Sequence, residues 1–224
     1  MATTARNGLP TVWVSHIKGL LVGEQSCLFR AWIQAHFRIE TRPQTFDFTA
    51  WRVDHTALLD MTVETLKAEG WTVTVEGQNF FRLMGRHAIL SGKPDLIARK
   101  GLRVKVVDVK TGRCRDADST QVAIYMIALS LAWNRVGIHI DGEVVYKRDG
   151  VLEHAVYQDH VVSVPLESVR PLAPRLFSLL RQIGNQDRPA ATPSQQECRY
   201  CDVSKVDCPD RIDEASPDVN TTEF

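Results

Sequence analysis

The chain has 224 residues, of which 44% are hydrophobic and 24% charged, and its 27 basic residues balance its 27 acidic ones. This composition is that of an ordinary globular protein, and a formal net charge of zero excludes bulk attraction to nucleic acid or to a membrane surface. The longest apolar run, about residues 122–133, is too short to span a bilayer, and no apolar core of signal-peptide length begins the chain. We therefore expect a cytoplasmic protein without a membrane partner.

The N-terminal part of the chain predicts helices that follow a short strand at residues 11–15. Apolar residues recur at helical spacing through 21–37, and Cys27 lies on the apolar stripe. A second helix is predicted over 49–70, which has capping residues at both ends. His55 lies on the apolar stripe of this helix, where a histidine is more often a core residue than a metal ligand.

From residue 71 the hydrophobic period changes to two, which is typical of strands. The predicted elements are strands at 71–76 and 80–84, a hairpin over 95–110 that turns at 99–101, a buried helix over 119–133, strands at 136–146 and 152–158, and a helix over 165–184 whose two prolines delay its start. A polar linker follows, and the last residues, 210–224, are expected to be disordered. This order predicts an α/β fold with a mixed central sheet flanked by helices.

The open end of the predicted hairpin carries charged residues. Asp95 begins its first strand, and Asp108 and Lys110 end its second strand on the same face as Val104 and Val106. Pairing would bring Asp95 beside Asp108, and two adjacent carboxylates repel unless a cation lies between them. Phosphodiester hydrolysis with Mg²⁺ or Mn²⁺ suits this geometry. An ordinary surface Asp–Lys pair is the alternative, and the short pattern alone favours neither.

Two polar residues stand on the otherwise apolar helix that follows. Gln121 and Tyr125 are one helical turn apart and share a face. If buried, their amide and phenol need hydrogen-bond partners, which a DNA phosphate or the paired carboxylates would provide. The sequence alone favours the simpler interpretation, a solvated Gln121 and a Tyr125 that belongs to the core.

Five cysteines, an odd number, argue against a disulfide framework in a reducing compartment and favour a metal site. Cys198, Cys201 and Cys208 lie within eleven residues, so a fourth ligand would come from Cys27 or Cys114. Zinc ribbons usually have two C-x-x-C pairs, whereas this segment has one pair and a single further cysteine. The spacing is therefore not the usual one of a zinc ribbon, and by itself it leaves the identity of the metal open.

The ordered motifs resemble those of the PD-(D/E)XK nuclease superfamily, and of its RecB-like branch in particular: Pro94-Asp95, Asp108-Val109-Lys110 and Gln121-x-x-x-Tyr125. One cysteine before these motifs and three after them is similar to the AddB-type nucleases and the CRISPR-associated Cas-four exonucleases, in which four cysteines hold a [4Fe-4S] cluster. The compact length of the chain is more similar to the Cas-four group. The resemblance covers about residues 15–209.

The resemblance implies a restriction-endonuclease-like core over 1–184, a linker with an iron–sulfur module at 185–209 and a disordered tail at 210–224. It implies metal ligation by His55, Asp95, Asp108 and the Val109 carbonyl, with Lys110 as the catalytic lysine and Gln121 and Tyr125 helping to hold DNA and the site. It also implies a [4Fe-4S] cluster on Cys27, Cys198, Cys201 and Cys208.

The activity implied by the resemblance is that of a Mn²⁺- or Mg²⁺-dependent DNA exonuclease that acts on single strands or DNA ends. Its implied partners are DNA and either a CRISPR adaptation integrase or recombination proteins, and a homo-oligomer is left open. The alternative is a catalytically silent module that binds DNA ends for a partner enzyme and contains a structural zinc or iron–sulfur site. Intact Asp95, Asp108 and Lys110 favour the enzyme.

Overall fold

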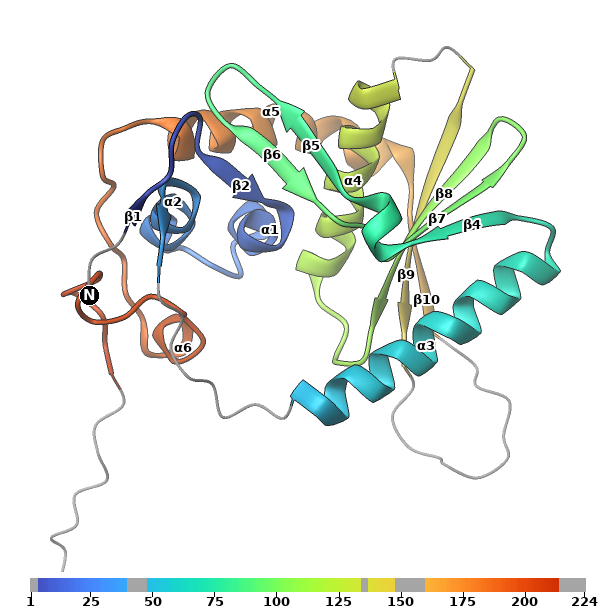
Figure 1. Ribbon diagram of the computed structural model, residues 1–224, viewed down its shortest axis with the longest axis horizontal. Coiled ribbons are helices and arrows are strands. Elements are labelled where there is room, and N and C mark those ends of the chain that lie inside the picture. Colours follow the sequence, from blue (N-terminus) through green and yellow to red (C-terminus); the bar gives the residue numbers. More distant parts are fainter. Residues whose placement is uncertain (1–3, 40–47, 134–136, 148–159, 214–224) are drawn as a thin grey trace, which may run out of the picture.

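The computed structural model describes residues 4–39, 48–133, 137–147 and 160–213. Its larger sheet has five strands in the order β10-β9-β8-β7-β4 (Figure 1). The strands are β4 (Thr72–Val75), β7 (Leu96–Lys100), β8 (Arg103–Lys110), β9 (His139–Tyr146) and β10 (His160–Val164). β8 and β9 run parallel and are joined through helix α4 (Asp116–Trp133), whereas the other neighbours are antiparallel.

A smaller sheet lies beside the first and has three strands in the order β2-β6-β5. These are β2 (Thr11–Trp13), β6 (Ile89–Gly92) and β5 (Phe81–Met84). β2 runs parallel to β6, and β5 pairs with β6 as a hairpin. A short 3₁₀ helix, η1 (Glu76–Asn79), connects β4 to β5, and two-residue strands β1 (Thr4–Ala5) and β3 (Phe37–Arg38) form a separate ribbon.

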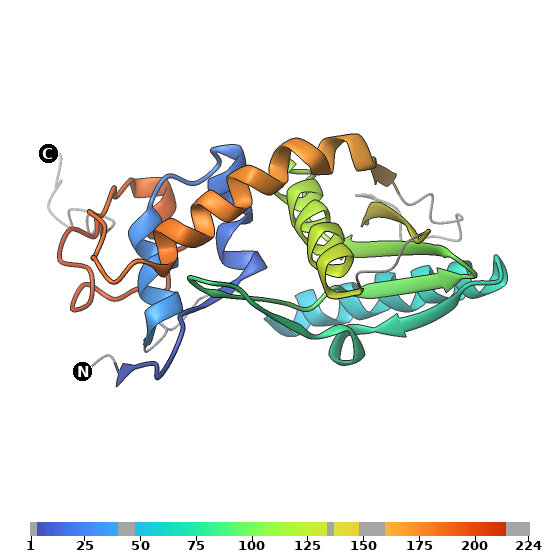
Figure 2. The same ribbon diagram turned by 90° about the horizontal axis from the view of Figure 1, so that it is seen from above.

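Helices cover both faces of the larger sheet. Besides α4, the described helices are α1 (Val14–Val22), α2 (Leu28–His36), α3 (Phe48–Ala68), α5 (Leu166–Gly184) and the short α6 (Gln195–Arg199). Figure 2 shows α4 on one face of the sheet and α3 on the other. None of the helices in the described part of the chain is long and apolar enough to cross a membrane.

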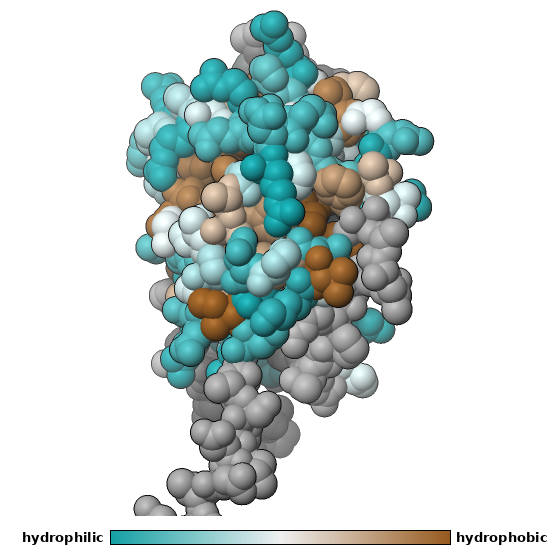
Figure 3. All heavy atoms as spheres, turned by 90° about the vertical axis from the view of Figure 1, so that its left-hand side faces the viewer, coloured by the Kyte–Doolittle hydropathy of each residue, from teal (hydrophilic) through white to brown (hydrophobic). Residues whose placement is uncertain are grey.

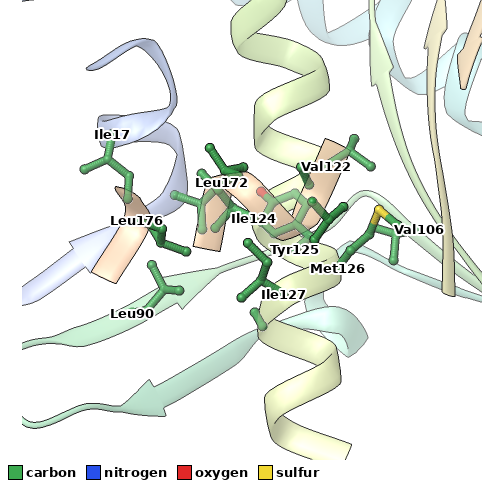
Figure 4. Close-up of a cluster of buried hydrophobic side chains, with 14 of the residues drawn as sticks. Ile17, Leu90, Val106, Val122, Ile124, Tyr125, Met126, Ile127, Leu172 and Leu176 are labelled. Carbon is green, nitrogen blue, oxygen red and sulfur yellow. The ribbon is translucent and has the colours of Figure 1, made fainter. Parts of the chain in front are cut away.

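The main core surrounds α4, which is apolar on nearly every side and is buried along most of its length from Ala117 to Leu129. Its side chains pack against α1, α5, β6 and β8, as Figure 4 shows for Ile17, Leu90, Val106, Leu172 and Leu176. A second cluster lies under α3, where Leu58, Leu59 and Leu66 meet Val107 and Val109 of β8. Because both faces of β8 are buried, the end of this strand is held rigidly between two cores.

The two ends of the chain meet at α2. Phe29, Trp32 and Ile33 of this helix form a third hydrophobic cluster with Val203 and Cys208. The red C-terminal segment lies beside the blue N-terminal helices in both ribbon views (Figures 1 and 2). Figure 3 looks at the side that carries β1 and α6, where hydrophilic residues predominate and hydrophobic ones form small separate areas.

Several predicted elements are confirmed: the hairpin with its turn after Lys100, the helices over 49–70 and 119–133, and the strands near 71–76, 80–84 and 136–146. The predicted strand at 152–158 lies outside the described residues, as does the tail from residue 214. Residues 210–213 of the expected tail are described, and Arg211 among them is buried. The division of the chain at residue 184 stays a prediction.

Two expectations about helices are wrong. The predicted helix over 21–37 is two helices, because Gly23 has a φ of 77° and ends α1, and Cys27 is the N-cap of α2 instead of a residue on a helical stripe. Helix α5 is not delayed by its prolines, since it begins at Leu166 and contains Pro171 and Pro174. Burial of its apolar side chains against α4 outweighs the lost backbone hydrogen bonds.

Candidate active site and a cavity lined by four cysteines

Two carboxylates face each other at the open end of the β7–β8 hairpin. The register pairs Leu96 with Val107, so that Asp95 lies across from Asp108. Asp95 Oδ2 accepts a 2.9 Å hydrogen bond from the Val109 N–H, and Asp108 is only 1% exposed. The close approach that the alternation of the strands predicts is therefore confirmed.

Lys110 lies beside both carboxylates and forms an ion pair with Asp108 Oδ2. Burial lowers the pKa of Lys110, but the charges of Asp108 and Asp95 outweigh it, and the net pKa shift is upward. Burial raises the pKa of Asp108 to about 7, although Lys110 opposes the shift. Burial also raises the pKa of Asp95, but its hydrogen bond with His55 and the charge of Lys110 outweigh this and leave that pKa lowered.

His55 reaches the same pair of carboxylates from α3. Its Nε2 lies 3.7 Å from Asp95 Oδ2, and the interaction with Asp95 raises the pKa of His55. Leu58 and Leu59, which follow it on the helix, pack into the second core and fix the orientation of this part of α3. His55 is thus a residue of the site and not a core histidine, contrary to the interpretation that the sequence alone favours.

Gln121 and Tyr125 approach the site from α4. The Gln121 amide donates hydrogen bonds of 3.0 Å to Asp108 Oδ1 and to the Tyr125 hydroxyl, which in turn donates to the Lys93 carbonyl at 3.4 Å. Both side chains are buried. The simpler interpretation of a solvated Gln121 is wrong, because the helix begins at Asp116 and places Gln121 beyond its first turn, where its amide donates to Asp108 of β8.

Asp118 is a neighbouring charged residue that sequence reasoning missed. It is 3% exposed, pairs with Lys18 at 2.7 Å and accepts a 3.2 Å hydrogen bond from the Tyr146 hydroxyl. Its position three residues before Gln121 puts it on the same helix face, and this spacing is a signal in the sequence. Asp118 and Lys18 therefore extend the polar network away from the paired carboxylates.

Glu76 is a second residue that was missed. It has a φ of 32°, a backbone conformation that residues other than glycine rarely adopt and that is often found near functional sites. Its backbone N–H donates to the Asp95 carbonyl at 2.8 Å, and its carboxylate lies 3.4 Å from the ammonium group of Lys93. The segment before β5 is thus tied to the strand that carries Asp95.

The chemistry of these residues fits a divalent cation. Among the described residues, Asp108 Oδ2 is buried and accepts no hydrogen bond of regular geometry, and the charge of Asp108 is offset mainly by the Lys110 ammonium. Carboxylate, imidazole and carbonyl donors of the kind found at Asp95, His55 and Val109 are ligands that Mg²⁺ and Mn²⁺ accept. Within the described part of the chain, no three acidic, histidine or cysteine side chains are already gathered around one point to hold an ion.

The four cysteines named by the resemblance line one cavity near the ends of the chain. Its lining consists of Cys27, Phe29, Arg30, Pro193, Glu197, Cys198, Cys201, Val203, Cys208 and Arg211. Burial raises the pKa of the Cys208 thiol, and the thiols of Cys27, Cys201 and Cys198 raise it further. Cys114 is exposed and is not part of this lining.

Two charged side chains next to the cysteines hold the walls of this cavity together. Glu197 accepts hydrogen bonds from the Ser26 N–H at 3.0 Å, the Ser26 hydroxyl at 2.8 Å and the Cys27 N–H at 3.2 Å. Arg211, which is 5% exposed, donates to the carbonyl oxygens of Val203 at 2.9 Å, Cys201 at 3.0 Å and Cys198. Neither residue was identified from the sequence.

Paired carboxylates with a lysine at the end of a hairpin are an arrangement suited to metal-dependent hydrolysis of phosphodiester bonds. The sequence matches the family model of the PD-(D/E)XK nuclease superfamily over residues 18–209, and the chain belongs to this superfamily. Membership implies a metal-dependent nuclease with DNA as its substrate.

One solved structure that the chain matches is titled "Crystal structure of SSO0001". It has 16% sequence identity to this chain and a TM-score of 0.45, over 93% of this chain and 90% of the other. No curated protein matches the chain.

Proposed function

We propose that the chain is a Mg²⁺- or Mn²⁺-dependent DNA exonuclease whose site is built on Asp95, Asp108 and Lys110. The observation that carries this proposal is the buried Asp108 carboxylate, whose Oδ2 forms an ion pair with Lys110 and, within the described part of the chain, has no hydrogen bond of regular geometry. Isolating a charge from water in this way lowers the stability of the fold, which favours a functional explanation for it.

The proposed roles follow from the contacts of each side chain. His55, Asp95, Asp108 and the Val109 carbonyl would hold the metal ion, which supplies a water of lowered pKa and stabilises negative charge on the phosphate. Lys110 would orient the attacking water and offset charge on the phosphate, since its own ammonium is held by Asp108. Gln121 fixes one oxygen of Asp108, and Tyr125 in turn fixes Gln121.

Cleavage of end-labelled single- and double-stranded DNA in Mn²⁺ or Mg²⁺ tests this proposal. We expect the Lys110→Ala variant to lose about 100-fold or more in rate. Lys67→Ala is the matched control, because Lys67 forms an exposed ion pair on α3. This variant should cleave DNA as fast as the parent does. Equal cleavage by the Lys110→Ala variant would overturn the assignment. DNA binding without any metal-dependent cleavage would favour the silent end-binding module instead.

The finer proposal is a RecB-like nuclease similar to the Cas-four group, with a [4Fe-4S] cluster on Cys27, Cys198, Cys201 and Cys208. It is supported by the cavity that these four residues line together, although Cys27 is far from the others in sequence. Such a cluster, when bound, adds a covalent link between the two ends of the chain. Cys27 is preferred to Cys114 as the fourth ligand because Cys114 does not line the cavity.

Iron and zinc analysis of the anaerobically purified protein tests the cluster. We expect a brown protein that contains iron, and a Cys27→Ser variant that loses the iron. Cys114→Ser is the control and should keep it, since that thiol is exposed. Stoichiometric zinc without iron would support the zinc alternative, and iron that depends on Cys114 would reassign the fourth ligand.

The biological setting follows from the same resemblance. We propose that the protein works in the cytoplasm with either a CRISPR adaptation integrase or recombination proteins. Neighbouring genes that encode an integrase would support the first setting, and genes for a helicase or recombinase would support the second.

A further inference from the structure

The smaller sheet has an outer face that the two main cores do not use. Alternation along β2 and β5 sends Val12, Phe81 and Leu83 toward the main core. The intervening residues project to the other side, and the outer face therefore consists of Thr11, Trp13, Phe80, Arg82, Met84 and Ile89. Phe80 and Met84 are 48% and 78% exposed, so this face is open to solvent.

A groove of about 600 Å³ lies over this outer face. Thr11, Arg82, Met84 and Ile89 of the sheet contribute to it, and residues 4–9 and Arg38 complete its lining. Three arginines, Arg6, Arg38 and Arg82, line the groove, and none of its lining residues is acidic. Because the net charge of the chain is zero, this concentration of positive charge is local and gives the groove a preference for anions.

Aromatic side chains continue the same face toward the candidate active site. The rings of Trp13 and Phe80 lie 5.9 Å apart by their centroids, and Phe80 is half exposed. Ser91 pairs with Trp13 on one side and with Arg82 on the other, and its buried hydroxyl oxygen has no hydrogen-bond partner. The aromatic ring of Trp13 and the guanidinium group of Arg82 therefore belong to residues that are aligned across the three strands of this sheet.

Strand β6, which contributes Ile89 to the groove, leads along the chain to the paired carboxylates. Asp95 follows Ser91 by four residues, so their Cα atoms lie at most about 14 Å apart. Between them, Gly92 packs so closely against the rings of Phe81 and Tyr125 that a Cβ atom there would lie 2.7 Å from each. The outer face and the site are thus fixed to each other through β6 and its continuation.

We propose that this groove binds a single strand of DNA on its way to or from the active site. Arg6, Arg38 and Arg82 contact its phosphates, and bases stack on the exposed ring of Phe80. A cationic groove with aromatic rings beside it suits a single strand better than an acidic peptide, which offers no flat bases for stacking. The inference rests on the proposed nuclease function and adds to it a surface for the DNA strand outside the paired carboxylates.

Binding to a fluorescein-labelled oligothymidine in EDTA tests the inference without requiring cleavage. We expect the Arg38→Ala/Arg82→Ala double variant to bind about tenfold or more weakly and to show a salt dependence lowered by about 1.4 in the slope of log K against log salt. Phe80→Ala should weaken binding without changing that slope. The control is the Lys67→Ala/Arg103→Ala double variant, which removes two exposed cations outside the groove and should bind as the parent does.

Different results would contradict the proposed nuclease and the proposed groove. Loss of affinity in the Arg38→Ala/Arg82→Ala variant, with no cleavage by the parent in Mn²⁺, would support the groove while removing the proposed nuclease. Metal-dependent cleavage with unchanged affinity and salt slope in that variant would overturn the groove alone. Poly-glutamate serves as a second probe. If the Arg38→Ala/Arg82→Ala variant lost affinity for poly-glutamate but kept its affinity for the oligothymidine, the proposed DNA groove would be overturned in favour of a site for an acidic protein partner. All three substituted side chains are exposed, so the fold should be unaffected.

Discussion

The carboxylate of Glu197 accepts the backbone N–H of Cys27 at 3.2 Å, across 170 residues of sequence. Two further hydrogen bonds from Ser26 end on the same carboxylate. Glu197 directly precedes Cys198, and its hydrogen-bond partner is Cys27 itself; both cysteines line the cavity. Hydrogen bonds between protein groups therefore fix the position of Cys27 relative to Cys198. The two ends of the chain are therefore held together by more than the proposed cluster.

Glu197→Ala should weaken this connection. Hydrogen bonds to a charged group contribute about 1.5–3 kcal/mol when buried, and the partial exposure of this group reduces the expected loss to about 1–2 kcal/mol. Iron retention in a chelator should fall with it, because Cys27 is less well positioned. Urea unfolding and iron analysis measure the two effects. Glu64→Ala is the control, since Glu64 is largely exposed on α3; if Glu197→Ala behaves as this control does, Glu197 has no positioning role.

Gln121→Leu should reduce the rate of DNA cleavage by about 10- to 100-fold. The substitution leaves Asp108 Oδ1 without its donor, and the carboxylate loses its fixed orientation. We expect kcat to fall and the Mn²⁺ concentration required for half-maximal activity to rise, whereas KM for DNA changes little. A Gln182→Leu variant alters an exposed glutamine on α5 and serves as the control. A fall in thermal stability with unchanged kcat would show that Gln121 is only structural.

The sequence predicts the hairpin site well and its surroundings poorly, for physical reasons. Alternation in β7 and β8 determines which side chains face each other, so the meeting of Asp95 and Asp108 follows from local pattern alone. The burial of Gln121 depends on the start of α4 at Asp116, three residues before the predicted helix, which the pattern of the segment does not indicate. Strand β6 was not predicted because its four residues show no alternation of exposed and buried positions.

The stability of the protein should depend on pH through His16. Burial and the charges of Arg30 and Arg6 together lower the pKa of His16 to about 4, although the charge of Asp202 opposes the shift. In the unfolded chain the pKa is near 6.5, so the unfolded state binds the proton more readily. The contribution of neutral His16 is therefore complete above pH 6.5 and is lost as the pH falls toward 4.

Urea unfolding at pH 7.5 and pH 5 checks this dependence. We expect His16→Gln to lose less stability between the two pH values than the parent does, by roughly 1–2 kcal/mol. His139→Gln is the control, because the side chain of His139 is 71% exposed. The same pH dependence in the parent and in His16→Gln would show that His16 is as easily protonated in the folded protein as in the unfolded chain.

Adjacent residues of α5 allow a test of what holds this proline-containing helix in place. Leu176 is fully buried in the main core, whereas its neighbour Phe177 is 48% exposed. Leu176→Ala should lower the free energy of unfolding by about 2–5 kcal/mol, because it removes buried apolar surface and leaves a cavity between α5 and α4. Phe177→Ala should change it by no more than about 0.5 kcal/mol. Denaturant unfolding measures both, and similar losses would contradict the orientation of α5, since both side chains would then have to be buried to the same extent.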